Sequence, residues 1–376
     1  MYDASVLGTV GVGSAALYHA ARRGLRVLGL DRFEPGHDRG SSHGDTRIIR
    51  MAYYEHPDYV PLLRRAYQLW SQLENETGER LYEEVGLLEV GAEDGELIPG
   101  VLRCAAEHGL ELERLEAADV ARRFRGFRCP DGCAAVFERQ AGFLHVERCV
   151  RTHLKAAVAR GAEHRWGVEL RGWRRCGENR EVATSAGTVA ARRIILAPGA
   201  WASQLLSDID VPWRVLLKHL YWLEPRDDAY RATEGGSAFF FDLPWGMFYG
   251  FPQIDAQGVK LGEHSGGRPI ADPLVADRSP SSIDFARVEA FASECMPSLT
   301  NRLQRQSTCF YTMTPDAHFV IDQHPADPSV VYAAGLSGHG FKFTSALGEL
   351  LVAWSLDGAP NLPVDFLSAR RFATPR

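Results

Sequence analysis

The sequence predicts an α/β (α+β) protein with two parts, one built from βα units and one built on a large antiparallel sheet. Three observations support this fold class. An apolar strand, a glycine-rich turn and a helix follow one another at the start of the chain. A buried strand followed by a loop of small residues and a helix recurs over 330–356. Between them, residues 212–265 are rich in aromatic residues and glycine, and their short alternating runs are typical of antiparallel strands.

The composition is that of a globular protein, with 376 residues of which 45% are hydrophobic and 24% are charged. This length suggests two or three domains of roughly 100–200 residues each. The formal net charge of -6 argues against a nucleic-acid partner, because such proteins carry a basic excess. No apolar run approaches the ~20 residues that span a bilayer, so we expect no membrane partner.

The N-terminus and the cysteines indicate where the protein is found. No charged segment followed by an apolar run, as in a signal peptide, precedes the first strand. The seven cysteines are an odd number in a long chain, which favours a reduced, cytoplasmic setting. Cys129 and Cys133 have no second pair at zinc-site spacing, so we predict no metal site.

Lysine is rare in this chain. Only four of the 42 basic residues are lysine, and the other 38 are arginine. The lysines are Lys155, Lys218, Lys260 and Lys342. A biased composition is the simplest cause. A remaining lysine can nevertheless mark a position that requires a compact ammonium rather than a planar guanidinium.

The N-terminal elements resemble a nucleotide-binding βαβ unit. In order, they are a strand over 4–7, a glycine turn over 8–13, a helix over 14–23 and a strand over 26–30. A helix start after a glycine turn can bind a pyrophosphate, and an acid about 20 residues later can bind ribose hydroxyls. The cofactor-binding residues predicted here are Gly8, Gly11, Gly13 and Asp31. Val10 stands where the middle glycine is expected, so a tight βα turn without a nucleotide remains an alternative.

Further βα elements occur in the middle and at the end of the chain. We predict helices over 59–74, 146–160, 283–305 and 341–356, and strands over 81–90, 192–197 and 330–334. These elements predict a discontinuous, Rossmann-like nucleotide domain over 1–83, 142–211 and 316–376. The substrate domain is then formed by 84–141 and 212–315.

Four local patterns carry candidate chemistry, and each also has a purely structural interpretation. Arg47 and Arg50 would share a helix face and could bind a carboxylate, or they could form a solvated basic face. Lys260 lies in an aromatic strand, where a lysine is costly unless it is exposed or used. Lys342 opposes the helix dipole in a first turn, unless its stem reaches solvent. Cys309, taken alone, is typical of an inert buried cysteine.

Taken together, these patterns resemble the monomeric sarcosine oxidase and N-methyltryptophan oxidase family, within the glycine/D-amino-acid oxidase superfamily. The resemblance covers nearly the whole chain. It rests on Gly40–Arg50 (GSSHGDTRIIR), Tyr249–Pro252 (YGFP), Lys260–Gly262 with His264, Cys309–Tyr311, His318–Pro325 (HFVIDQHP) and Gly335–Phe343 (GLSGHGFKF). It implies an FAD-binding domain and a substrate domain with an antiparallel sheet.

The resemblance also implies roles for individual residues. It makes Cys309 the thioether anchor of a covalent flavin, Arg50 and Lys342 the cations that hold the substrate carboxylate, and Lys260 the residue that activates oxygen. The remaining catalytic and cavity residues are Arg47, His43, Tyr249, His264 and Tyr311. The further cofactor-binding residues are Ser41, Gly199, Trp201, Gly338, His339 and Gly340, together with His43, Arg47 and Lys342.

The function that this set implies is oxidation of secondary N-methyl amino acids by an FAD enzyme. A sarcosine-like substrate would yield glycine and formaldehyde, while O2 is reduced to hydrogen peroxide. The same chemistry on a cyclic imino acid such as proline or pipecolate, or on a bulkier N-methyl amino acid, remains an alternative. A flavin-free binding protein is a more distant one. We expect a monomer whose partners are its amino-acid substrate and O2.

Overall fold

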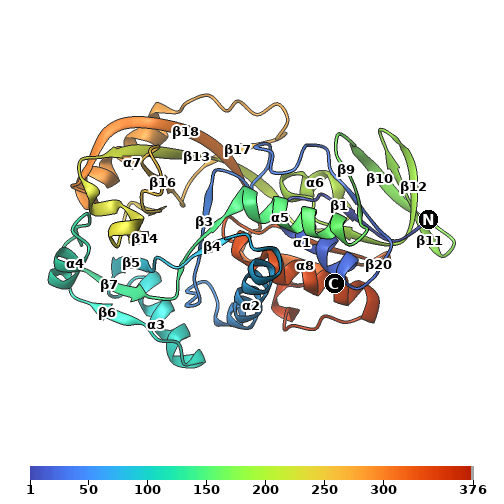
Figure 1. Cartoon of the computed structure of the whole chain (residues 1–376), viewed down its shortest axis with the longest axis horizontal. Helices are drawn as coiled ribbons and strands as arrows, with labels where there is room; N and C mark the ends of the chain where they lie inside the picture. The colour runs from blue at the N-terminus through green and yellow to red at the C-terminus, as the bar shows by residue number, and fades with distance from the viewer. Residues whose placement is uncertain (374–376) are drawn as a thin grey trace.

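The computed structural model describes residues 1–373 and places two large sheets at opposite ends of an elongated molecule (Figure 1). The helices are α1 (Gly11–Arg22), α2 (Val60–Thr77), α3 (Leu97–His108), α4 (Ala117–Arg123), α5 (Val146–Ala159), α6 (Ala202–Leu205), α7 (Ser282–Cys295) and α8 (Thr344–Asp357). Short 3-10 turns are η1 (Pro57–Tyr59), η2 (Gly199–Trp201), η3 (Asp228–Tyr230), η4 (Ala232–Glu234), η5 (Phe341–Phe343), η6 (Asp365–Leu367) and η7 (Ala369–Phe372). The predicted α/β (α+β) fold class is confirmed.

The first sheet has eight strands in the order β10-β11-β12-β1-β2-β9, with β20 beside β12 and β19 beside β20. Its strands are β1 (Tyr2–Leu7), β2 (Val27–Leu30), β9 (Glu163–Arg165), β10 (Leu170–Cys176), β11 (Asn179–Thr184), β12 (Gly187–Leu196), β19 (Val320–His324) and β20 (Asp327–Ala334). The central strands β20, β12, β1, β2 and β9 run parallel. Their carboxyl ends therefore meet at one edge, where open α/β sheets bind ligands.

Helices α1 and α8 cross closely beside this sheet. A Cβ atom on Gly348 would lie 2.5 Å from the Cβ atom of Ala15, so only glycine lets the two backbones approach this far. The start of the chain and its last long helix are thereby packed into one core.

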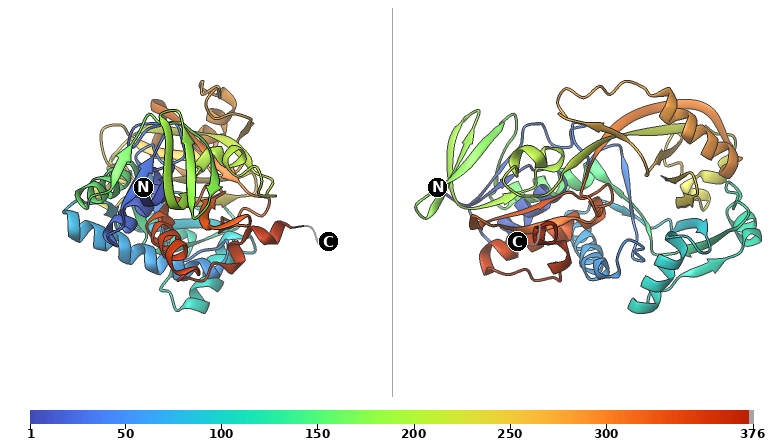
Figure 2. Two further views of the ribbon diagram at one scale, coloured as in Figure 1. Left: turned by 90° about the vertical axis from the view of Figure 1, so that its right-hand side faces the viewer. Right: turned by 180° about the vertical axis from the view of Figure 1, so that it is seen from behind.

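The second sheet has nine strands in the order β17-β13-β16-β15-β14-β5-β7-β6, with β18 on the other edge of β13. Its strands are β5 (Leu87–Ala92), β6 (Glu113–Leu115), β7 (Cys133–Glu138), β13 (Arg214–Pro225), β14 (Ala238–Leu243), β15 (Gly246–Gly250), β16 (Val259–Glu263), β17 (Arg268–Ile270) and β18 (Leu299–Met313). All its pairings are antiparallel except that of β5 with β14. Figure 2 shows β13 and β18 together with α7 at the end of the molecule opposite the first sheet.

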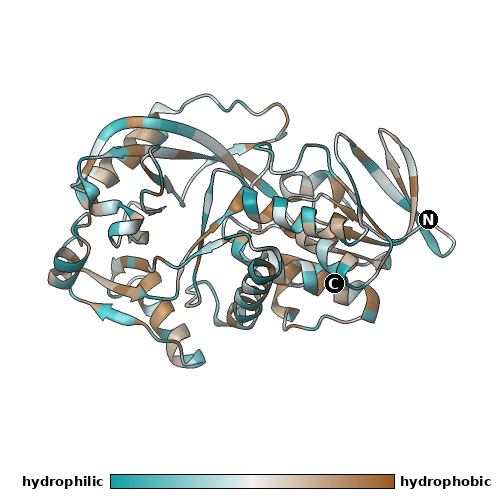
Figure 3. Ribbon diagram, in the orientation of Figure 1, coloured by the Kyte–Doolittle hydropathy of each residue, from teal (hydrophilic) through white to brown (hydrophobic). Residues whose placement is uncertain are grey.

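A small third sheet joins the two ends. It consists of β3 (Thr46–Ile49), β8 (Gly142–His145) and β4 (Tyr82–Glu83), and β8 is the middle strand. Figure 3 shows hydrophobic residues on both large sheets and on the helices beside them, as expected for buried cores. None of the helices within residues 1–373 has the length and apolar character needed to cross a membrane.

Two sequence predictions about secondary structure are wrong. The helix predicted over 283–305 ends at Cys295, and residues 299–313 form strand β18 instead. Pro297 follows that end, and proline disfavours helix in the residue before it. The single strand predicted over 81–90 is divided into β4 and β5, because Gly86 adopts a φ of 73° between them. The helix predicted over 59–74 is confirmed as α2, which Gly78 ends in the left-handed conformation.

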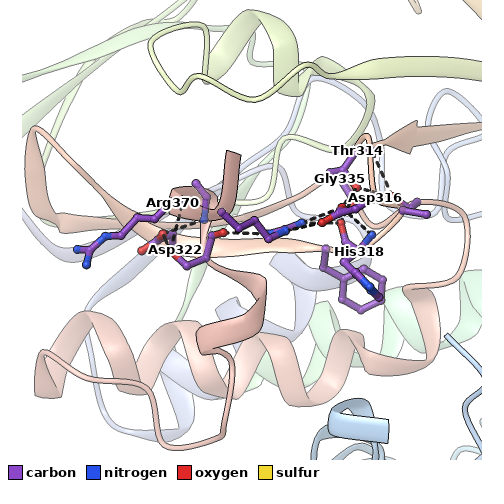
Figure 4. Close-up of polar contacts among 12 residues, drawn as sticks. Thr314, Asp316, His318, Asp322, Gly335 and Arg370 are labelled. Carbon is purple, nitrogen blue, oxygen red and sulfur yellow. Dashed lines mark hydrogen bonds and ion pairs between the residues drawn. The ribbon is translucent and has the colours of Figure 1, made fainter. Parts of the chain in front are cut away.

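The last described turn of the chain is tied to the loop before β19 (Figure 4). Arg371 Nε donates to Asp316 Oδ2 at 2.7 Å, and its Nη2 donates to the carbonyl of His318 at 3.1 Å. The Ser368 hydroxyl donates to Asp322 Oδ2 at 2.6 Å. These bonds fix residues 368–371 on the edge of the first sheet.

The same loop also supports the loop after β20. The Thr314 hydroxyl bonds to Asp316 Oδ1 at 3.1 Å, which closes the loop on itself. The carbonyl of Ala317 lies 2.9 Å from His339 Nε2. The C-terminal turn thereby holds the loop before β19, and the Ala317 carbonyl of that loop bonds to His339.

Candidate functional site

A cavity lies at the carboxyl ends of the parallel strands and extends toward β15 and β18. Its lining joins segments that are far apart in the sequence: residues 7–8, 10–12, 30–33, 40–42, 197–201, 310–312 and 333–342. The sequence predicted most of these segments as one site, and the fold brings them together.

The nucleotide end of the cavity is built around close backbone contacts. Gly8 has a φ of 83°, and a Cβ atom on Gly13 would lie 1.7 Å from the carbonyl oxygen of Gly8. No side chain fits there, so the turn requires glycine at position 13. Val10 precedes α1, lines the cavity and packs against the hydrophobic core. The substitution of valine for the middle glycine is thus accommodated within the turn.

Asp31 holds this turn from the end of β2. Its Oδ2 accepts a hydrogen bond of 2.6 Å from the backbone N–H of Thr9, and its Oδ1 accepts one of 3.0 Å from Phe33. Burial raises the pKa of Asp31, but the nearby His37 ring at 3.7 Å and the hydrogen bonds from Phe33 and Thr9 outweigh it and lower the pKa below its usual value. The carboxylate therefore stays charged at the edge of the cavity.

Three buried polar atoms that line the cavity lack a hydrogen-bond partner among the described residues: His37 Nε2, Trp201 Nε1 and Thr344 Oγ1. Buried polar atoms without partners are costly, so such a cluster indicates that a polar ligand completes the site. Together with the glycine cradle, which is the turn of close backbone contacts formed by Gly8 and Gly13, these atoms fit a dinucleotide.

Arg50 is buried at the other end of the cavity and is already paired. Its Nη2 donates to both oxygens of Glu55 at 2.9 and 2.8 Å, and its Nη1 donates to Glu89 Oε1 at 3.0 Å. The rings of Tyr53 and Tyr54 lie 4.6 and 4.9 Å from the guanidinium carbon. Sequence reasoning missed both acids. Glu55 lies only five residues from Arg50, whereas nothing in the sequence pairs Glu89 with Arg50.

Lys342 lies beside Arg50 and does not reach solvent. Its side chain is buried in η5, and Nζ donates to the carbonyl of His339 at 2.9 Å and to the Tyr53 hydroxyl at 3.4 Å. The interpretation that its stem extends into solvent is therefore wrong. Burial lowers the pKa of Lys342 to about 7.

Arg47 lies on a strand, not on the helix face that the spacing suggested. It belongs to β3, where Nη1 donates to the carbonyl of Thr46 at 2.8 Å and Nη2 donates to that of Ser41 at 2.7 Å. Arg47, Arg50 and Ser41 nevertheless all line the cavity, because Arg50 lies just beyond the end of the strand.

Lys260 is buried on β16 behind strand β3. Its Nζ donates to the carbonyls of Gly44 and Thr46 at 2.5 and 2.8 Å, and to Thr46 Oγ1 at 3.1 Å. It also lies 4.6 Å from the centre of the Phe251 ring. Burial lowers its pKa well below the usual value. The alternative of a solvent-exposed lysine is therefore wrong.

Three aromatic side chains, Tyr249, His264 and Tyr311, form another part of the cavity wall. His264 Nδ1 lies 3.3 Å from the Tyr311 hydroxyl, and the Tyr249 ring lies 6.2 Å from the His264 ring. Burial, followed by the charge of Lys218, lowers the pKa of His264 to about 3. Burial raises the pKa of Tyr249 to about 12. This wall is uncharged at neutral pH.

The loop after β20 lies against this wall. Gly338 has a φ of 82°, and a Cβ atom there would lie 2.3 Å from the Tyr311 ring. The loop is fixed by His339, whose Nδ1 lies 2.5 Å from the Tyr53 hydroxyl. Gly338, His339 and Gly340 all line the cavity.

Several predicted site residues lie outside the cavity lining. Cys309 is buried in β18, although its neighbours Phe310 and Tyr311 reach the cavity. His43 is also buried, and its Nε2 has no partner among the described residues. Gly13 and Lys260 lie immediately behind lining segments. The predicted residues Gly8, Gly11, Gly199 and Trp201 do line the cavity.

Comparisons with known proteins agree with this arrangement. Residues 3–354 match the family model described as "FAD dependent oxidoreductase". The chain is 37% identical to monomeric sarcosine oxidase of Streptomyces avermitilis, covering 99% of this chain and 98% of that protein. It is 35% identical to N-methyl-L-tryptophan oxidase of Yersinia pestis, covering 99% of each.

Solved structures show the same fold. NikD, described as an unusual amino acid oxidase essential for nikkomycin biosynthesis, matches with a TM-score of 0.86 and 24% identity over 98% of this chain and 97% of that one. L-proline dehydrogenase from P. horikoshii matches with a TM-score of 0.84 and 20% identity over 98% and 97%.

The glycine cradle generates a prediction about cofactor retention. Gly13→Ala places a methyl group on the carbonyl of Gly8 and should weaken FAD binding about tenfold or more, equal to about 1.4 kcal/mol. FAD retained after gel filtration, measured by absorbance, checks this in protein that also carries Cys309→Ser, so that no thioether can hold the flavin. Gly91→Ala is the control, because its methyl would make only ordinary contacts of 3.4 Å in β5. Equal FAD content in both variants would contradict the role of the cradle.

Proposed function

This chain belongs to the family of FAD-dependent oxidoreductases, and from that premise we propose that it is an oxidase of secondary N-methyl amino acids. A sarcosine-like substrate would be converted to an imine, which hydrolyses to glycine and formaldehyde, with O2 reduced to hydrogen peroxide. The observation that carries the proposal is the cavity itself. Its lining includes two buried basic groups, Arg50 and Lys342, and a wall of Tyr249, His264 and Tyr311 that is aromatic and uncharged.

FAD, when bound, accepts a hydride equivalent from the carbon next to the amine nitrogen and passes the electrons to O2. The residues proposed to hold it are Gly8, Gly11, Gly13, Asp31, Ser41, His43, Arg47, Gly199, Trp201, Gly338, His339, Gly340 and Lys342. The chain itself binds the substrate, orients it and excludes water from it.

Arg50 and Lys342 would bind the substrate carboxylate. Glu55 occupies the guanidinium of Arg50 through two hydrogen bonds. A substrate carboxylate therefore competes with the Glu55 carboxylate for the same donors. Glu89 bonds a different nitrogen of Arg50 and so can hold the side chain in place during this exchange. A carboxylate beside Lys342 favours its charged form.

The aromatic wall suits an amine that has lost its proton. Tyr249 and His264 are both neutral at pH 7, because their pKa values are about 12 and about 3. They therefore offer no negative charge that would stabilise an ammonium ion. A neutral amine keeps its nitrogen lone pair, which hydride loss from the neighbouring carbon requires.

A bulkier N-methyl amino acid is the second candidate substrate, and the resemblance to N-methyl-L-tryptophan oxidase supports it. The cations recognise the carboxylate that all such substrates share, so they do not separate the candidates. A flavin-free binding protein is not favoured, since the chain belongs to an FAD family and retains the glycine cradle.

A peroxide assay tests the proposed function directly. Sarcosine, N-methyl-L-tryptophan, proline and pipecolate are supplied to the holoenzyme, and hydrogen peroxide and formaldehyde are measured. We expect the highest kcat/KM with sarcosine, with formaldehyde and peroxide formed in equal amounts. Peroxide without formaldehyde from a cyclic substrate, at higher kcat/KM, would instead identify an imino-acid oxidase. No turnover of any of them would refute the proposal.

We further propose that Cys309 carries the flavin through a thioether. Cys309 is buried in β18 directly before two residues that line the cavity. After acid precipitation the yellow colour should stay with the wild-type protein and move to the supernatant in Cys309→Ser. Cys176→Ser, which alters an exposed thiol, is the control and should behave as the wild type. Colour that stays with Cys309→Ser protein would exclude this anchor.

We assign oxygen activation to Lys260. Its ammonium is buried among oxygen acceptors, and a fixed positive charge stabilises the negative charge that develops on O2. Lys260→Met should slow flavin reoxidation by O2 about 100-fold or more, equal to about 2.7 kcal/mol, while anaerobic reduction changes far less. Stopped-flow absorbance measures both steps. Equal slowing of the two steps would remove this role from Lys260.

A further inference from the structure

Lys218 is a third buried lysine, and neither the sequence patterns nor the proposed reaction gives it a role. Only 4% of its surface is exposed, in the middle of strand β13. Within residues 1–373 it forms no ion pair with a carboxylate at 4 Å or less. A buried ammonium without such a partner is costly unless other groups take up its hydrogen bonds.

The sheet leaves a gap beside this lysine. On one edge of β13, residues 215–217 pair with β17 and residues 221–223 pair with β16. The turn that joins these two strands, residues 264–267, therefore lies opposite Lys218. On the other edge, Lys218 pairs directly with Cys309 of β18. Lys218 thus stands where the strand ladder is interrupted.

The ammonium of Lys218 donates hydrogen bonds to the backbone carbonyls that have no strand partner in this gap. Nζ donates to the carbonyls of His264, Ser265 and Gly266 at 3.3, 2.5 and 3.1 Å. A lysine has three N–H donors, so all three are matched. A Cβ atom on Gly267 would lie 2.8 Å from Lys218 Cδ, which shows how closely the turn follows the lysine stem.

This turn carries one wall of the substrate cavity. His264 begins the turn, and its Nδ1 lies 3.3 Å from the Tyr311 hydroxyl. Lys218 Nζ lies 5.4 Å from the centre of the Tyr311 ring. Lys218 therefore contacts the backbone of one wall residue and the ring of another.

The side chain of Lys218 is charged at pH 7, and the acid that attracts it most, Glu263, is bound by other residues. Burial lowers its pKa to about 8, against the attraction of Glu263, so at pH 7 the ammonium form is favoured. Glu263 itself is bound by Arg287 at 2.7 Å and by the Ser265 hydroxyl at 2.8 Å. An arginine fork would not fit three converging carbonyls as a compact ammonium does.

We propose that Lys218 is a positioning residue for the oxidase site, since its ammonium fixes the 264–267 turn and thereby holds His264 against Tyr311 in the substrate cavity. The link to the reaction rests on the proposed function, whereas the fixing of the turn does not.

Hydrogen exchange and a double-mutant cycle test this role in the holoenzyme. Lys218→Met keeps a stem of similar size without the charge, and Lys155→Met on the exposed face of α5 is the matched control. Amides of residues 262–268 should exchange about tenfold faster in Lys218→Met and at the wild-type rate in Lys155→Met. KM for sarcosine should rise about tenfold while kcat changes less than about threefold.

The cycle separates positioning from a general loss of structure. In a His264→Ala background, Lys218→Met should change KM less than about twofold, because the side chain that it positions is absent. Additive effects in the cycle, or unchanged exchange in Lys218→Met, would overturn the proposal. So would loss of the acid-stable yellow colour with normal exchange, which would make Lys218 a partner of Cys309 instead. If Lys218→Met does not fold, Lys218→Gln undergoes the same comparisons.

These outcomes also distinguish a failure of the role proposed for Lys218 from a failure of the proposed oxidase function. If the wild type oxidises none of the amino acids, the proposed function fails, and faster exchange in Lys218→Met still shows whether the turn depends on this residue. If the wild type is active but exchange is unchanged, only the role of Lys218 fails.

Discussion

The burial of positive charge between the two large sheets is the constraint on which the rest of the site depends. Lys218, Lys260 and Lys342 are all buried, and each ammonium is held by backbone carbonyls. Arg47 is held in the same way. A carbonyl dipole satisfies the hydrogen bonds of a cation without cancelling its charge, whereas a carboxylate cancels it. Carboxylates therefore do not cancel the charge of these four groups at hydrogen-bond distance, whereas Arg50 is bound by two acids.

These cations determine how the loops around them fold. The carbonyls of Gly44 and Thr46 converge on Lys260, and between them Asp45 adopts a positive φ of 73°. The loop that supplies a carbonyl to Lys342 contains Ser337, with a φ of 45°. Both conformations are uncommon for residues other than glycine. Backbone strain thus occurs next to the cations, where hydrogen bonds to the ammonium groups compensate for it.

The sequence predicted local patterns well and long-range partners poorly. The glycine turn and Asp31 were predictable because a βαβ unit places its ligand groups at fixed spacing. The strand over 299–305 was missed because its partner β13 lies some 80 residues earlier, and only that pairing makes it a strand. Arg47 was placed on a helix for the same reason, since β3 exists only by pairing with β8. Glu89 reaches Arg50 through the fold alone.

The strand order of the parallel sheet also determines when, during synthesis, the binding pocket can form. Strand β12 lies between β1 and β20, and α1 packs on α8, so β1 and α1 meet segments that are made much later. The cavity needs residues 7–8 and 10–12 together with residues 333–342 and Thr344. A chain still emerging from the ribosome therefore has the glycine turn but lacks the opposite wall. The binding pocket closes only when the segment around residues 333–344 has left the exit tunnel, so cofactor loading follows the synthesis of that segment.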